Sequence, residues 1–120
     1  MNPKIDKVEM DPADHRTVTA SGPIEWETDE ASATFMVVIA QVKPQGRIVY
    51  ASGRGKRTYW PNDERWEARA TIDDPNDQFM YGDANGWADA SVKETNGNIE
   101  PYPWGVKNLT IERPAVAVPQ

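Results

Sequence analysis

The stretch of sequence that decides the fold is ATFMVVIAQV, residues 33–42. It is the only long apolar run in the chain, and it is rich in the β-branched residues that favour strands. As a helix it would be too short to cross a bilayer, which takes about 20 residues. Side chains alternate between the two faces of a strand, so Phe35 and Ile39 would point one way and Val38 the other. Because both faces are apolar, we expect this strand to lie centrally in a sheet, with Val38 and Ile39 buried on opposite faces.

Shorter segments in which apolar and polar residues alternate lie on both sides of this run. They predict strands at residues 4–10, 16–21, 47–52, 66–72, 87–93 and 106–112. The segment at 66–72 alternates most clearly, with Trp66 and Ile72 among its inward residues. Residues 24–28 could add an edge strand, and residues 79–81 a further short apolar piece. Apolar residues do not recur at helical spacing, so the pattern predicts seven to nine short strands.

Turn residues separate these segments. Asn96-Gly97 is the strongest short hairpin signal in the chain and predicts a type I′ turn. Beyond it, Pro101 and Pro103 lack the backbone N–H that a strand ladder needs, so we expect them to break the returning strand.

Short strands at regular spacing with turn residues between them are typical of an antiparallel sandwich. We therefore predict a single all-β domain at residues 1–113, an immunoglobulin-like β-sandwich, followed by a short C-terminal tail at 114–120. An eight-stranded barrel is the alternative architecture. We favour the sandwich because a continuous apolar strand coexists with alternating ones, as it does between central and edge positions of a sheet.

Four segments carry a resemblance to a known class of domain: residues 17–22, 33–41, 66–71 and 86–92. In their order and pattern they resemble small bacterial immunoglobulin-like β-sandwich domains of uncharacterised function, across most of the chain. The resemblance implies a sandwich fold and brings no catalytic residue with it. The Cys-Trp-Cys core of antibody domains is absent, so no antibody-like role is implied.

The composition excludes several kinds of site. The chain has no Cys, and therefore no disulfide, no thiolate metal site and no thiol nucleophile. Its formal net charge of −6 opposes non-specific binding to nucleic acid or to an anionic membrane. The N-terminal residues do not form a signal peptide and the sequence has no transmembrane run, so we expect a cytoplasmic protein as the chain stands.

No combination of residues predicts catalysis or metal binding. His15 is the one histidine, and in its Asp-Pro loop we expect it to be a solvated turn residue rather than a catalytic base. Asp and Asn gather at residues 73–77 and 83–89, where oxygen ligands could hold calcium. The second segment begins like an EF-hand loop but lacks its third and its closing ligand, and Asp and Asn are ordinary turn residues. We therefore expect two solvated turns, no cofactor, no bound metal and no enzymatic activity.

The most distinctive stretch is basic and aromatic, and it contains Arg54, Lys56, Arg57, Tyr59 and Trp60. Arg and Trp often dominate interface energies, so we predict that these residues form an exposed patch that binds an acidic protein partner. Basic residues interleaved with aromatics also suit single-stranded nucleic acid, which the net charge does not favour.

Two alternatives remain for the aromatic residues. Exposed rings could instead form a flat face for carbohydrate, with contributions from Trp60, Trp87, Trp104, Tyr59, Tyr81 and Tyr102. In the other alternative the bases are solvated, Gly53 and Gly55 mark a bulge or turn, and the aromatics cap the core. The leading prediction is a non-catalytic interaction or assembly module that binds a protein through this stretch or through a sheet edge. A carbohydrate-binding module is the alternative, and the oligomeric state is left open.

Overall fold

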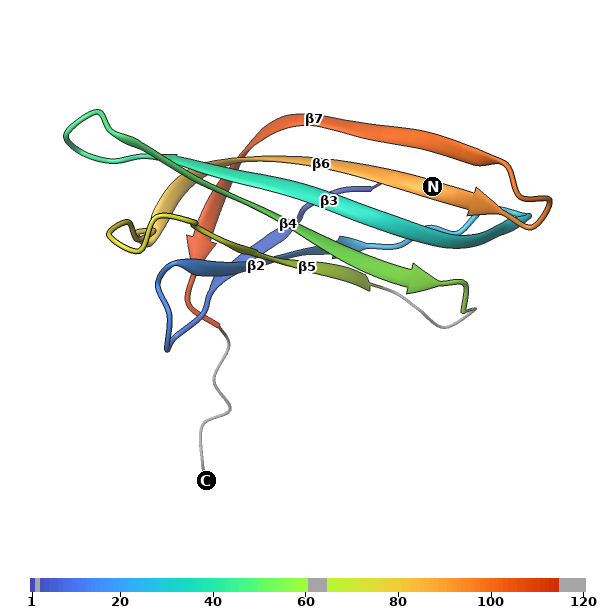
Figure 1. The fold of residues 1–120 in the computed structure, drawn as a ribbon, viewed down its shortest axis with the longest axis horizontal. Helices are drawn as coiled ribbons and strands as arrows, with labels where there is room; N and C mark the ends of the chain where they lie inside the picture. The colour runs from blue at the N-terminus through green and yellow to red at the C-terminus, as the bar shows by residue number, and fades with distance from the viewer. Residues whose placement is uncertain (2, 61–64, 115–120) are drawn as a thin grey trace, which may run out of the picture.

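The computed structural model describes residue 1, residues 3–60 and residues 65–114 of the chain. Seven strands make up the fold: β1 (Lys7–Met10), β2 (Thr17–Pro23), β3 (Glu30–Val42), β4 (Ile48–Thr58), β5 (Arg65–Thr71), β6 (Gly82–Glu94) and β7 (Ile99–Glu112). Figure 1 shows the long strands β3, β6 and β7 running side by side. The described residues form no helix, so none of them belongs to a helix long and apolar enough to span a membrane.

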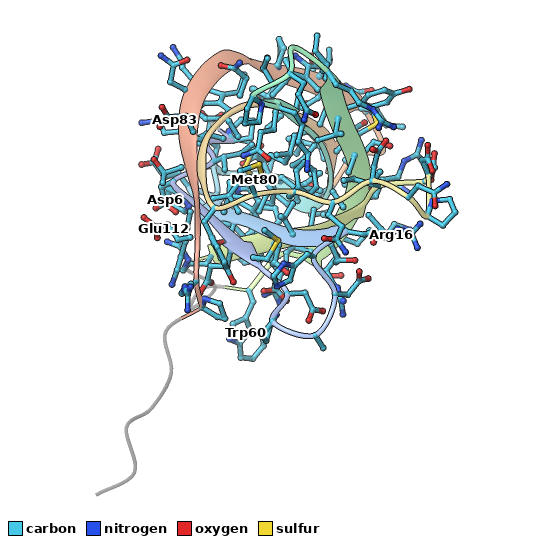
Figure 2. The ribbon with its side chains drawn as sticks, turned by 90° about the vertical axis from the view of Figure 1, so that its left-hand side faces the viewer. Asp6, Arg16, Trp60, Met80, Asp83 and Glu112 are labelled. Carbon is cyan, nitrogen blue, oxygen red and sulfur yellow. The ribbon has the colours of Figure 1, made fainter. Side chains whose placement is uncertain are left out.

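The strands close into a barrel in the order β1-β2-β5-β4-β3-β6-β7. The closing contact is the parallel pair β1–β7, in which Val8 lies opposite Ile111, and every other pair is antiparallel. Seen from its end, the ribbon forms a ring around a filled interior (Figure 2). The predicted immunoglobulin-like sandwich is therefore wrong, because a sandwich would keep two separate sheets, whereas here β5 pairs with both β2 and β4 and joins the two halves.

The strand predicted at residues 33–42 lies between β4 and β6, in the centre of the sheet as expected. Ile39 and Phe35 point into the barrel and are fully buried. The Phe35 ring stacks on Trp66 of β5, with ring centroids 4.7 Å apart and an interplanar angle of 2°. Val38 is only half-buried and lies on the outside of the barrel, so its predicted burial is wrong.

Apolar side chains fill the interior from all seven strands and from the segment before β1. The bulky members are Val8, Met10, Val18, Phe35, Val37, Ile39, Val49, Trp66, Val92 and Ile111, and Met1, Pro3 and Ile5 join them. The interior therefore has a packed core rather than a ligand-holding lumen, and binding sites are to be sought on the outer surface and at the ends of the barrel.

A buried amide closes one end of the barrel. The Gln41 side chain donates hydrogen bonds from Nε2 to the Met80 and Asp83 carbonyls, at 2.8 and 3.0 Å. Its Oε1 accepts a hydrogen bond from the Met80 N–H at 2.7 Å. Met80 accordingly lies near the centre of the end that faces the viewer in Figure 2. Because each polar atom of Gln41 has a partner, its burial leaves no unpaired group.

Two features of β6 and β7 differ from the predictions. The loop after β6 is closed by hydrogen bonds from the Glu94 N–H to the Asn98 carbonyl and from the Gly97 N–H to the Glu94 carbonyl, at 2.8 and 3.0 Å. Only Gly97, at φ 91°, is left-handed there, so the predicted type I′ turn, which requires two such residues, is wrong. The strand β7 also runs on through Pro101 and Pro103, which were expected to break it.

The remaining strand predictions fare unevenly. The alternation over residues 66–72 is confirmed, because Trp66, Ala68, Ala70 and Ile72 are all buried. Residues 24–28 form no strand. Asn62-Asp63, whose residue types favour a turn, and most of the predicted tail fall outside the described residues.

Candidate functional site

The five residues of the predicted binding patch do not share one surface. Arg54 and Lys56 lie on the outward side of β4 and are exposed, and neither forms an ion pair within the described part of the chain. Arg57 is also exposed, but the alternation of a strand turns it toward the opposite face. Tyr59 and Trp60 follow the end of β4 at the rim of the barrel. The stretch is thus a strand followed by a rim segment, and not a loop or hairpin.

Gly53 and Gly55 form neither a bulge nor a turn. Both lie within β4 where it crosses β5 closely. A Cβ built on Gly53 would lie 1.8 Å from the Arg69 carbonyl oxygen, and one on Gly55 would lie 2.0 Å from the Glu67 carbonyl oxygen. Glycine is needed here because no other residue lets the two backbones approach so closely.

A patch of apolar side chains covers the outside of β3, β4 and β6. We call it the outer apolar face, and it consists of Met36, Val38, Ala40 and Val42 of β3, Ile48 and Tyr50 of β4, and Trp87 of β6. Val42, Ile48 and Tyr50 are 61%, 62% and 66% exposed, and the others are half-buried. At a rise of about 3.4 Å per residue and a strand spacing of about 4.8 Å, the patch covers on the order of 300 Å². Exposed apolar patches of that size on a monomer are often functional.

Charged side chains of opposite sign flank one end of the outer apolar face. Met36 of β3 pairs with Arg54 on one side and with Asp89 on the other, so the three residues stand level across the sheet. Between them lies a shallow hollow of about 300 Å³, lined also by Thr34 and Ser91. The Asp89 Oδ1 atom is buried and has no hydrogen-bond partner among the described residues. A buried acceptor without a partner costs about 1–3 kcal/mol, so this position lacks a donor.

A second hollow, the rim pocket, opens at the end of the barrel where β3 begins and β4 ends. It has a volume of about 570 Å³ and is lined by Ile24, Trp26, Glu27, Thr28, Asp29, Glu30, Tyr59 and Thr95. The Tyr59 ring packs edge-on against Trp26, with centroids 5.6 Å apart. The amine of Met1 lies 3.2 Å from Glu27 and 3.3 Å from Glu30. Glu27 and Glu30 therefore already share a cationic partner.

Burial raises the pKa of Tyr102, and the nearby carboxylates of Glu27 and Glu30 add to the rise. The phenol therefore stays protonated well beyond neutral pH, and the rim combines aromatic rings with negative charge. The surroundings of Tyr59 and Trp60 at the rim are therefore acidic, whereas the sequence predicted a basic surface around these two residues.

The aromatic residues proposed for a sugar-binding face are scattered over the molecule. Tyr59 and Trp60 lie at the rim, while Tyr102 and Trp104 pack against the core. Tyr81 precedes β6 and lies at the other end of the barrel, where its ring contacts His15 edge-on at 5.9 Å. Trp87 lies apart from them on the outer apolar face, so in the described part of the chain the six rings do not gather on one surface that could carry a sugar chain.

Of the two acidic segments that the sequence predicted to be turns, residues 73–77 form one, and residues 83–89 do not. Asp83, Asn85 and Asp89 are spaced along β6. In the other segment, Arg47 lies 2.7 Å from the Asp77 carboxylate and 3.8 Å from that of Asp74. No group of three or more His, Asp or Glu side chains that could hold a metal ion occurs in the described ranges.

One edge of β7 is partly open to an added strand. Apart from Ile111 and Glu112, which pair with β1, β7 pairs only with β6, so residues 99–110 leave one edge open. Pro101 and Pro103 lie in that edge, and proline within a sheet is confined to positions whose N–H would face away from the neighbouring strand. A strand added at this edge would find two backbone N–H donors of β7 missing, which opposes pairing there.

Reasoning from the sequence placed Arg54 and Lys56 on the surface but missed the outer apolar face. The sequence does show that Met36, Val38 and Ala40 are apolar and alternate with the core residues of the same strand. Both sets were interpreted as buried, so the second set was not recognised as a surface. Comparison of the chain with protein-family models, with curated proteins and with solved structures found no match.

Proposed function

We propose that the chain is a non-catalytic interaction module that binds a protein partner through the outer apolar face and the adjoining Arg54 and Lys56. The observation that carries this proposal is the exposure of Val42, Ile48 and Tyr50 on the outside of a barrel that already has a complete core. Folding does not require apolar side chains on the outside of the barrel. The corresponding outer positions of β5 are occupied by polar and charged residues, Arg65, Glu67, Arg69 and Thr71.

The composition of the face suits a protein surface. Tyr, Trp, Met and Arg are enriched at interfaces, and this face contains Tyr50, Trp87, Met36 and, at its border, Arg54. Burying apolar area gives about 25 cal/mol for each Å² removed from water. A partner that covered the outer apolar face would therefore gain several kcal/mol before the costs of association. The scattered aromatic rings do not favour the carbohydrate alternative.

A matched pair of isoleucines tests the proposal. Ile48 lies on the outer apolar face at 62% exposure, and Ile99 lies on β7 at 65% exposure. The wild-type chain, immobilised at low density, is used to capture proteins from an extract of the source cells, which are quantified by mass spectrometry. We expect Ile48→Ser combined with Tyr50→Ser to reduce capture of the recovered partner at least tenfold.

The control variant Ile99→Ser should capture as much partner as the wild-type chain, with thermal melts showing that both proteins are folded. Equal losses in the two variants would mean that the outer apolar face has no special role. A wild-type chain that captures no protein from the extract and also stays monomeric at about 1 mM would overturn the proposed function.

A further inference from the structure

We infer that a second copy of this chain occupies the outer apolar face, in a two-fold symmetric dimer whose axis runs parallel to β3. This inference rests on the proposed function and names its partner. Charge is distributed unequally over the three strands of the face, and this distribution selects the axis.

The two strands that flank β3 differ in charge. On its outward side β4 carries Arg54 and Lys56 and no acid, whereas the outward side of β6 carries Asp83 and Asp89 and, near its end, Lys93. A two-fold axis parallel to β3, lying between two copies, places β4 of one copy over β6 of the other. The basic strand of each copy then meets the acidic strand of its partner, and the contact is made twice because the interface is isologous.

The strand register sets which residues meet. Arg54 and Asp89 both stand level with Met36, so the axis brings Arg54 of one copy over Asp89 of the other. Ser52 and Trp87 are both level with Val38, so the large ring lies over a small side chain. Packed sheets cross at about 30°, so this matching holds best near Met36 and Val38, at the centre of the contact.

The other in-plane axis, perpendicular to β3, is disfavoured by the same charges. It would place β4 over β4 and β6 over β6, and with the axis level with Met36 it would set Arg54 against Arg54 and Asp89 against Asp89. Like charges set against each other across an interface oppose association. With the axis parallel to β3, Lys56 lies over Ser91 and Lys93 over Thr58, so like charges do not meet along these strands.

The Asp89 side chain supplies a further observation at the same point. The Asp89 Oδ1 atom is buried without a hydrogen-bond partner among the described residues, at the edge of the hollow that Met36 and Arg54 also line. In the dimer the guanidinium of the second Arg54 arrives at that carboxylate. The flexible Met36 side chains meet on the axis, where they can adapt to the hollow.

The size of the face predicts a weak dimer. With its charged border it covers on the order of 400–500 Å² per copy, and a standard interface takes about 800 Å² from each partner. We expect a dissociation constant between about 10 µM and 1 mM, the range of transient assemblies.

Charge reversal tests the symmetry directly. Sedimentation of the purified chain from about 10 µM to 1 mM should show the mass rising from 13.4 kDa toward the dimer. We expect Arg54→Asp and Asp89→Arg each to weaken association at least tenfold, because each places two pairs of like charges in contact. An equimolar mixture of the two single variants should associate again, since both contacts in the mixed dimer are of opposite charge. Recovery in the mixture also shows that both variants are folded.

The controls carry the same changes of charge elsewhere. Lys107→Asp on β7 and Glu67→Arg on β5, both exposed, should associate as the wild-type chain does. Association that survives both charge reversals, or that is not restored by mixing, would overturn the dimer. A wild-type chain that stays monomeric at 1 mM but captures another protein in an Ile48-dependent way would overturn the second copy as partner and leave the interaction module standing. Failure of both experiments would overturn both proposals.

Discussion

Ile39 and Val38 are neighbours in the sequence whose side chains meet different surroundings. Ile39 is fully buried inside the barrel, and Val38 is half-buried on the outer apolar face. We expect Ile39→Ala to lower the free energy of unfolding by about 2–5 kcal/mol, the usual cost of emptying a packed aliphatic site. Val38→Ala should cost less than about 1 kcal/mol, because little of its packing is lost. Urea denaturation of the two variants measures both, and equal losses would contradict the placement of these side chains.

Asp14 makes the stability depend on pH. Its carboxylate accepts hydrogen bonds from the Arg16 N–H at 3.0 Å and from the Thr17 hydroxyl at 2.8 Å. These bonds hold the pKa of Asp14 below its ordinary value of 3.8. The unfolded chain therefore takes up the proton at a higher pH than the folded chain does. The stabilisation is complete above the unfolded pKa, and it is lost as the pH falls through the folded pKa.

We expect the melting temperature of the wild-type chain to fall between about pH 5 and pH 3, and to fall less steeply in Asp14→Asn, which cannot titrate. Asp73→Asn controls for the loss of one negative charge, because no described residue donates a hydrogen bond to that side chain. Identical slopes in the wild-type chain and in Asp14→Asn would show that the turn makes no contribution to the acid response.

At the scale of the strand, β4 depends on its glycines. A methyl group on Gly53 would lie 1.8 Å from a carbonyl oxygen of β5, which cannot move without opening the contact between the strands. Gly53→Ala should therefore destabilise the barrel by at least about 1–3 kcal/mol, the usual cost of overpacking.

Gly105→Ala on β7 is the matched control. Nothing lies within 4 Å of its added methyl group, and Gly105 is not among the residues with positive φ, so we expect no loss and a gain of up to about 1 kcal/mol. Similar losses in both would mean that the cost comes from β propensity and not from the close crossing.

The strands could be predicted from the sequence where side-chain alternation alone decides them. The alternation at Trp66 and Ile72 and the apolar run around Ile39 gave the right elements, because each requires one buried face. The prediction failed at Pro101 and Pro103, because proline is excluded only from strands paired on both sides, and pairing is not visible in a sequence. The turn at Asn96 failed for a related reason. A three-residue loop with one left-handed glycine also closes a hairpin there, and the dipeptide does not specify the loop length.

At the scale of the whole molecule, the choice between sandwich and barrel depends on contacts that leave no local trace. In both architectures apolar side chains alternate inward along each strand. What separates them here is the short pairing of β5 with β4 at Ser52–Arg54, together with that of β1 with β7. Gly53 was the local sign of the first contact, but an isolated glycine in a strand fits a bulge equally well.

Only the charged part of the candidate site could be predicted from the sequence. Arg54 and Lys56 are charged, and charge alone predicts exposure. The apolar side chains of Val38, Ile48 and Tyr50 predict burial by the same reasoning, and a sequence does not distinguish burial within the chain from burial by a partner. Only the closed barrel, with its core complete without them, identifies these residues as a surface.

The parallel pairing of β1 with β7 brings together the first and the last strand in sequence order, and this affects how the molecule reaches its structure. The entropic cost of closing a loop rises with its length, and topologies rich in distant pairings fold over milliseconds to seconds rather than microseconds. We expect this seam to form late, after the local hairpins. Until it forms, strand edges and the apolar lining are open to other chains, so the lifetime of the unclosed intermediate sets the risk of aggregation.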